Sequence, residues 1–191
     1  MEPLTTTLLI LGGIASLLII LYIFYWNRFV VLANRIANSW AQIDVQLKKR
    51  YDLVPNLIST VKGYAKHEKK IFENVTKARE RMMSAKAPGE KYRAGQDLTS
   101  ALKTILAIAE NYPKLRANEN FLMLQEELSG IENKIAYARQ FYNDSVLEYN
   151  NIVMMFPGNI FANIMNKKSK EYLDVPSEER KNIKVNFDEK E

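Results

Sequence analysis

The sequence predicts an all-α protein, with one N-terminal transmembrane helix followed by an antiparallel bundle of about four long helices. Three observations indicate this fold. The N-terminus is an uncharged apolar run, apolar residues then recur at steps of three and four, and only 7 glycines and 6 prolines interrupt the 191 residues. Long helices tolerate few such breaks. The expected organisation is an anchor at 1–26, a bundle at 27–156 and a juxtamembrane segment with a charged tail at 157–191.

The N-terminal run is long enough to cross a bilayer. No charged residue lies between Pro3 and Asn27, and at 1.5 Å per residue this length covers about 30 Å of hydrocarbon. A cleaved signal peptide would have a basic start and small residues at its end, whereas this run ends in bulky aromatics. Basic residues follow the run and none precede it. This asymmetry predicts an inner-membrane protein with its N-terminus outside and its bundle in the cytoplasm.

The first soluble helix is expected to continue the membrane helix, because apolar residues recur from Phe29 to Leu47 without a glycine or proline. We expect a bend at 50–56. Asp52 there has the position of a helix cap, and Pro55 that of the first turn of a second helix.

Loop composition predicts the later boundaries. Two glycines and a proline fall between Ser84 and Gly95, and Pro113 is expected to end the third helix. A fourth apolar pattern then runs from Phe121 to Val153, with Asn118 before it as a cap. Sustained spacing of this kind is typical of a helical bundle.

Short connections make neighbouring helices antiparallel, so the bend at 50–56 and the connection at 111–120 should share the end far from the membrane. Polar residues at that end form a candidate partner-binding surface: Lys48, Lys49, Arg50, Asp52, Asn56, Asn118, Glu119 and Asn120. The alternative is that these residues cap helix ends and satisfy backbone groups.

A second candidate surface follows Pro157, where apolar residues precede three lysines. The candidate membrane contacts are Ile160, Phe161, Ile164, Met165, Lys167 and Lys168. Apolar side chains can dip into the headgroup region while lysines pair with anionic lipid. The alternative is that the segment caps the open end of the bundle core. The tail from Tyr172 to Glu191 is expected to be extended or disordered, because its charges alternate densely.

Composition argues against several chemistries. The chain has no cysteine and a single histidine, His67, so one copy cannot build a thiolate site, a histidine metal pair or a histidine triad. No glycine-rich phosphate loop is present, and acidic residues are mixed with basic ones rather than leaving the basic stripe typical of nucleic-acid binding. We therefore expect no enzymatic activity, no cofactor and no nucleic-acid partner. An active site shared between two copies through His67 is the remaining enzymatic alternative.

Two long blocks of the sequence resemble the LemA family of bacterial membrane-anchored helical proteins. They are NSWAQIDVQLKKRYDLVPNLISTVKGYAKHEKKIFENVTKAR (38–79) and ANENFLMLQEELSGIENKIAYARQFYNDSVLEYNNIVMMFPGN (117–159), and the ending YLDVPSEERKNIKVNF adds to them. The resemblance implies an antiparallel bundle on one membrane anchor, without an established enzymatic activity. It also implies association of some members with membrane metalloproteases and of a magnetosome branch with organelle formation.

Two functions fit these expectations. The leading hypothesis is a scaffold or adaptor that binds protein partners, a membrane metalloprotease or other copies of itself, through its cytoplasmic bundle. The alternative is a membrane-remodelling or lipid-binding protein that acts through the segment from Ile160 to Lys170. Bundle surfaces suit the first function, and the apolar and basic segment suits the second.

Overall fold

The computed structural model describes residues 3–174, and within that range the chain forms helices and no strands. The elements in chain order are α1 (Pro3–Lys62), α2 (Lys69–Ser84), α3 (Pro88–Ile108), the 3₁₀-helix η1 (Ala109–Asn111), α4 (Pro113–Arg116), α5 (Glu119–Met154) and α6 (Gly158–Ile164). The predicted all-α class, with a long apolar N-terminal helix ahead of a helical bundle, is therefore confirmed. The extended conformation expected for the tail concerns mainly residues 175–191, which lie outside the described residues.

The chain divides into two compact units. Unit 1 contains residues 1–50 and 127–172, and unit 2 contains residues 51–126 and 173–191. The boundary between the units falls inside α1 and inside α5.

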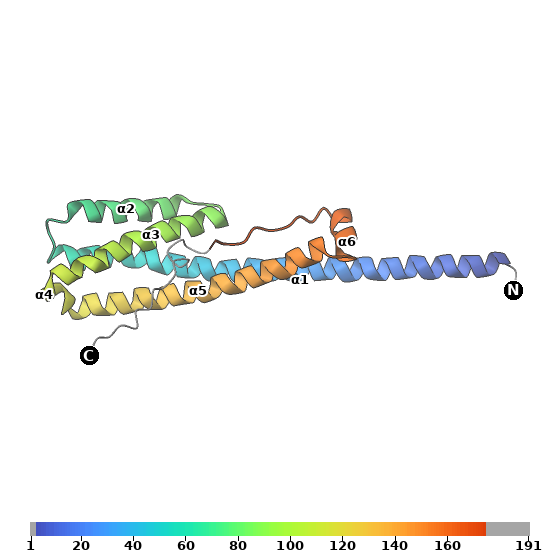
Figure 1. Cartoon of the computed structure of the whole chain (residues 1–191), viewed down its shortest axis with the longest axis horizontal. Coiled ribbons are helices and arrows are strands. Elements are labelled where there is room, and N and C mark those ends of the chain that lie inside the picture. Colours follow the sequence, from blue (N-terminus) through green and yellow to red (C-terminus); the bar gives the residue numbers. More distant parts are fainter. Residues whose placement is uncertain (1–2, 175–191) are drawn as a thin grey trace, which may run out of the picture. The chain divides into compact units, whose positions relative to one another are not determined.

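Unit 1 is built from α1, the second part of α5 and α6. In Figure 1, α5 runs back along α1, and ring contacts join the two helices at Phe29 with Tyr149 and at Trp40 with Tyr142. The residue number of the contact rises along α1, from Phe29 to Trp40, while that of its partner on α5 falls, from Tyr149 to Tyr142. The two helices are therefore antiparallel. The buried cluster of this unit consists of Phe29, Leu32, Ile36, Val146, Tyr149 and Ala162. Burial of a large side chain of this cluster, such as Phe29, Leu32 or Ile36, contributes about 1.5–3 kcal/mol to the free energy of folding.

Unit 2 contains the end of α1, the helices α2, α3 and α4, and the start of α5. Helices α2 and α3 lie side by side in Figure 1 and contact each other along their lengths. Fully buried side chains come from every helix of the unit, and they include Leu57, Val61, Met82, Leu98, Ile105, Leu115 and Phe121. Of these residues, Leu57 and Val61 on α1, Leu98 and Ile105 on α3, and Phe121 at the start of α5 lie on apolar stripes with helical spacing.

The predicted bend at 50–56 is wrong, because α1 continues through it to Lys62 and contains Pro55. Proline has no N–H and leaves the carbonyl four residues earlier without a helical donor. That carbonyl belongs to Tyr51, and the Arg79 side chain of α2 donates to it through Nε at 3.0 Å. A side chain thus replaces the missing backbone donor, and the turn comes later, between α1 and α2.

The predicted loop from Ser84 to Gly95 is also mostly wrong, because α3 already begins at Pro88. Proline suits the first turn of a helix, where its missing N–H has no partner to lose. The cap expected at Asn118 is confirmed: its side-chain oxygen accepts a hydrogen bond from the Phe121 N–H at 3.0 Å. The Asn118 amide also donates to the Tyr64 hydroxyl at 3.1 Å, which joins the turn after α1 to the start of α5.

Candidate functional site

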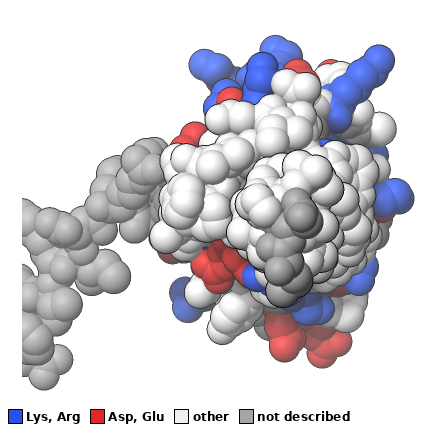
Figure 2. Space-filling view, turned by 90° about the vertical axis from the view of Figure 1, so that its right-hand side faces the viewer, with Lys and Arg blue, Asp and Glu red and all other residues white. Residues whose placement is uncertain are grey.

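The first part of α1 presents an apolar surface on all sides. Among the described residues, α1 is the one helix with a stretch long and apolar enough to cross a membrane, and none of that stretch is buried. Figure 2 looks onto the end at which α1 begins, and the helix surface there is white, without basic or acidic side chains. An apolar helix exposed all round is typical of a membrane span.

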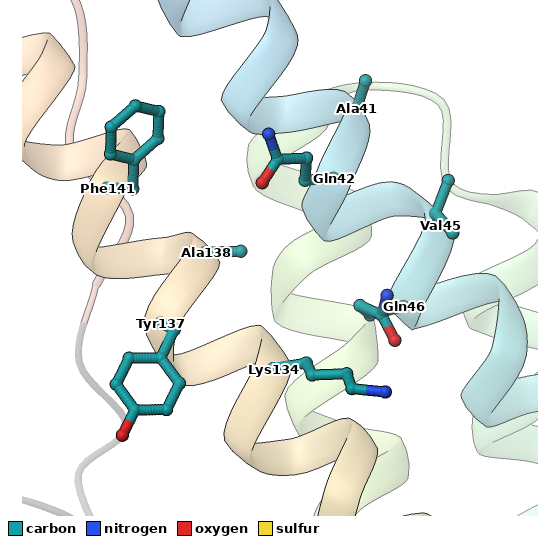
Figure 3. Close-up of a pocket in the computed structure, with 8 residues that line it drawn as sticks. All are labelled: Ala41, Gln42, Val45, Gln46, Lys134, Tyr137, Ala138 and Phe141. Carbon is teal, nitrogen blue, oxygen red and sulfur yellow. The ribbon is translucent and has the colours of Figure 1, made fainter.

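Unit 1 also contains an open groove between α1 and α5, which we call the α1–α5 groove. It has a volume of about 600 Å³ and is lined by Ala41, Gln42, Val45, Gln46, Lys134, Tyr137, Ala138 and Phe141. In Figure 3, Gln42 points toward α5, while Ala138 and Lys134 point toward α1. Grooves between two helices of a bundle are a common place for a ligand or a third helix.

Apolar side chains beside the α1–α5 groove are exposed to solvent. Tyr137 is 76% exposed, and Phe141 and Val45 are each about half exposed. The lining also contains the small side chains Ala41 and Ala138, which leave room for another backbone to approach closely. Exposed aromatic residues beside a groove are typical of protein-binding surfaces.

The lining of the α1–α5 groove also contains polar groups. The side-chain oxygen of Gln46 is shielded from solvent and accepts no hydrogen bond from the described residues. Lys134 is the one charged residue in the lining, so the lining carries a single positive charge.

Ion pairs fix the register of the two helices that form the groove. Arg28 and Arg35 of α1 both bind Glu148 of α5, with Arg35 Nη1 2.6 Å from the Glu148 carboxylate. Near the other end, Arg50 pairs with Glu132 and its side chain is only 3% exposed. The exposed pairs contribute less than about 1 kcal/mol each, whereas loss of the partner of a buried Arg50 would cost more.

Helix α6 packs against α1 at the end of the apolar run. The rings of Tyr25 and Phe161 are stacked with centroids 4.8 Å apart, and Lys167 Nζ lies 5.5 Å from the centre of the Trp26 ring. Aromatic residues at the end of a span are typical of the headgroup boundary. These contacts place α6 beside the end of the apolar run.

The chain after α6 is held against α5 by one buried amide. Asn150 is 2% exposed; its amide donates to the Lys170 carbonyl at 2.9 Å and its oxygen accepts from the Lys170 N–H at 2.8 Å.

Burial raises the pKa of Tyr149, and burial together with the charge of Glu171 raises the pKa of Tyr142. Both phenols remain neutral at physiological pH.

The predicted partner-binding residues are divided between the two units. Lys48, Lys49 and Arg50 belong to unit 1, and the other five belong to unit 2. Arg50 is a buried ion-pair residue, and Asn118 is a helix cap, as the structural alternative anticipated. The α1–α5 groove was not identified from the sequence. The available signal was that Tyr137 and Phe141 stand four residues apart on α5, outside its buried stripe.

The predicted membrane contacts lie together beside the end of the apolar run, but with different exposure. Ile160 and Ile164 are exposed, Met165 and Lys167 are half-buried, and Lys168 is exposed. Phe161 is instead buried against Tyr25, so it presents little surface to lipid. Three neighbouring residues, Met154, Met155 and Phe156, are also exposed, and they were not predicted as membrane contacts.

Unit 2 has a further shallow groove of about 610 Å³. It is lined by Lys62, Lys66, Lys69, Phe72, Glu73, Thr76, Lys77 and Glu80. The Lys62 ammonium lies 5.6 Å from the centre of the Phe72 ring, and the mixed charges indicate a solvated surface. No group of three or more metal-binding side chains occurs within residues 3–174.

Comparison with known proteins identifies relatives of the chain. A sequence profile of the LemA family matches residues 39–187. The magnetosome protein MamQ 2 of Paramagnetospirillum magneticum is 24% identical over 173 residues, which cover 77% of this chain and 64% of that protein. MamQ of Magnetospirillum gryphiswaldense is 23% identical over the same extent. The chain therefore spans slightly less than two thirds of the length of these relatives.

Proposed function

This chain belongs to the LemA family, and from that premise we propose that it is a non-enzymatic membrane-anchored scaffold that binds a partner protein through the α1–α5 groove. The observation that carries the proposal is the exposure of Tyr137, Phe141 and Val45 around that groove. An anchor confines the protein to the membrane, so a modest affinity at the groove is sufficient to concentrate a partner there.

The occupant that fits best is an amphipathic helix of another membrane protein. Two antiparallel helices with small residues between them can accept a third helix by ridge-into-groove packing. The single basic residue of the lining, Lys134, favours an acidic residue beside the partner's apolar stripe. Membrane metalloproteases are the partner class to test first, and a second copy of this chain is the competing occupant.

We place the groove on the cytoplasmic side of the inner membrane. Arg28 and Arg35 follow the apolar run, and no basic residue precedes it, so the positive-inside rule orients the C-terminal part inward. A reporter fused after Glu191 tests this: a fluorescent protein that folds in the cytoplasm should be bright, and an active periplasmic phosphatase at that position would contradict the orientation.

The test of the scaffold uses two variants matched for exposure on α5. Phe141 lines the groove and is 46% exposed, whereas Leu147 is 49% exposed and lies outside the lining. Full-length wild type, Phe141→Ser and Leu147→Ser are crosslinked in native membranes, and the adducts are quantified by mass spectrometry. Loss of one defined heterologous adduct in Phe141→Ser, with retention in Leu147→Ser, is the expected result. Equal adducts in all three proteins would overturn the groove as the binding surface.

A second candidate function is lipid binding or membrane remodelling through the segment from Ile160 to Lys170. The stacking of Tyr25 on Phe161 supports it, because this contact brings the segment to the end of the apolar run. Phe161→Asp would not test this function cleanly, since Phe161 is buried. Ile164 is exposed, so Ile164→Asp is the better variant; unchanged deformation of liposomes by this variant would argue against remodelling.

A further inference from the structure

The turn between α5 and α6 carries an exposed apolar patch, which we call the α5–α6 apex. It consists of Met154, Met155, Phe156, Ile160 and Ile164. Phe156 is 80% exposed, and the other four are about half exposed or more. Soluble proteins rarely leave five neighbouring large apolar side chains in water, and a contiguous patch of this kind marks a contact surface.

The contacts of α6 fix the position of the apex along α1. Phe161 stacks on Tyr25, Lys167 lies over Trp26, and Ala162 shares a buried cluster with Phe29. No charged residue precedes Arg28 in α1. The apex is therefore level with the last residues of the apolar run, where the hydrocarbon ends and the headgroups begin.

The backbone of the apex is suited to an apolar environment. Within the turn, the Met155 N–H donates to Asn151 at 2.8 Å, the Asn159 N–H to Met155 at 2.9 Å, and the Ile160 N–H to Pro157 at 3.2 Å. Pro157 has no N–H to satisfy. Because unpaired backbone donors are costly outside water, these three bonds lower the cost at which the turn enters the boundary region.

Basic residues accompany the apolar patch. Lys167 and Lys168 follow α6 after two further residues, and Lys168 is exposed. An apolar face with lysines at its edge is the arrangement by which interfacial segments bind anionic membranes, with the apolar side chains about 5–10 Å deep.

We propose that the α5–α6 apex inserts Met154, Met155 and Phe156 into the headgroup boundary of the bilayer that α1 spans. The ligand is lipid: acyl chains contact the apolar side chains, and anionic headgroups contact the lysines. The protein is then held at two places, and rotation of unit 1 about the axis of α1 is restricted. This inference extends the second candidate function, lipid binding by the segment from Ile160 to Lys170, to three residues before that segment. It does not depend on the scaffold function, since the apex and the α1–α5 groove share no residue.

The chain contains no cysteine, so a single introduced thiol can be labelled uniquely. Four full-length variants are labelled with an environment-sensitive fluorophore and reconstituted into vesicles of phosphatidylcholine and phosphatidylglycerol. Met155→Cys and Phe156→Cys report on the apex, Leu18→Cys is the control inside the apolar run, and Leu147→Cys is the exposed control on α5. Lipids that carry a quencher on the acyl chain, near the headgroup for the apex and deeper in the chain for position 18, then detect direct lipid contact.

The expected result is blue-shifted emission and strong lipid quenching at positions 155 and 156, and neither at position 147. A blue shift without lipid quenching would mean that protein covers the apex, and it would overturn the inference, as would emission equal to that at position 147. Quenching at position 18 shows separately that α1 spans the bilayer. If lipid quenching is absent at position 18, α1 does not span the bilayer. Absence of quenching at the apex as well would then contradict both the inference and the membrane span on which it rests.

Discussion

Arg79 of α2 donates a hydrogen bond through Nε to the carbonyl of Tyr51 at 3.0 Å, at the one point in α1 where Pro55 removes the helical donor. The Arg79 guanidinium also lies 5.9 Å from the centre of the Tyr51 ring. One side chain thus allows the helix to continue through a proline and ties α2 to it. Beyond Pro55, α1 continues to Lys62.

Arg79→Ala should destabilise unit 2 by about 1–3 kcal/mol, because it leaves the Tyr51 carbonyl without its charged donor. The free energy of unfolding of the full chain in mild detergent measures this. In a Pro55→Ala background a backbone N–H is restored at position 55, so Arg79→Ala should cost clearly less there. Equal costs in both backgrounds would show that Arg79 does not substitute for the missing donor.

Gly158→Ala should destabilise unit 1. An added Cβ would lie 3.0 Å from Ile152 Cγ2 and closer still to the Ile152 carbonyl oxygen, which as backbone cannot yield cheaply. Gly130→Ala is the matched control, because nothing lies within 4 Å of its added Cβ. That change should be neutral or stabilising by up to about 1 kcal/mol, since alanine favours helix more than glycine. Thermal unfolding should separate the two variants, and similar melting temperatures would contradict the close packing at Gly158.

Asn150→Ala should release the chain after α6, because both hydrogen bonds to Lys170 disappear. The expected cost is about 1–3 kcal/mol, since a backbone donor and acceptor lose their partner. Limited trypsin digestion reports the release as faster cleavage after Lys167, Lys168 and Lys170. Asn151→Ala, at an exposed neighbouring position, should leave cleavage unchanged, and the same rate in both variants would refute the clamp.

Alkaline pH should weaken unit 1 through Tyr149. Burial raises its pKa in the folded protein above 10, the usual value, so between these two values the unfolded chain has lost the proton while the folded chain retains it. Stability from this group is complete below pH 10 and falls as the pH rises toward the folded-state pKa. The free energy of unfolding should decline less steeply above pH 10 in Tyr149→Phe than in wild type. Identical slopes would contradict the raised pKa.

The sequence predicted the periodic parts of this fold well and its interruptions poorly. The stripe that contains Leu32, Ile36 and Ile43 is buried as expected, because burial of an apolar stripe is a local property of a helix. The end of α1 was misplaced because the donor that compensates for Pro55 comes from Arg79, 24 residues later. Such a contact between distant residues leaves no periodic signal.

The candidate sites were predicted less completely for a related reason. The apolar and basic segment after Pro157 could be read from composition, and it lies beside Tyr25 and Trp26. The groove depends on which exposed residues of two antiparallel helices face the same side. Tyr137 lies on α5 and Val45 lies on α1. The sequence implies that these two helices pair, but it does not fix how each helix is rotated about its own axis. The lining of the groove therefore emerged only from the three-dimensional arrangement.

The most direct test of the scaffold is a photo-crosslinking amino acid placed at Tyr137 in the full-length protein in native membranes. We predict an adduct with one membrane protein, mapped by mass spectrometry to an amphipathic helix with an acidic residue beside its apolar stripe. The same probe at Gln140, which is exposed on α5 but outside the groove, should give no such adduct. An absence of adducts at Tyr137, or the same adducts at both positions, would contradict the claim that the α1–α5 groove binds a partner protein.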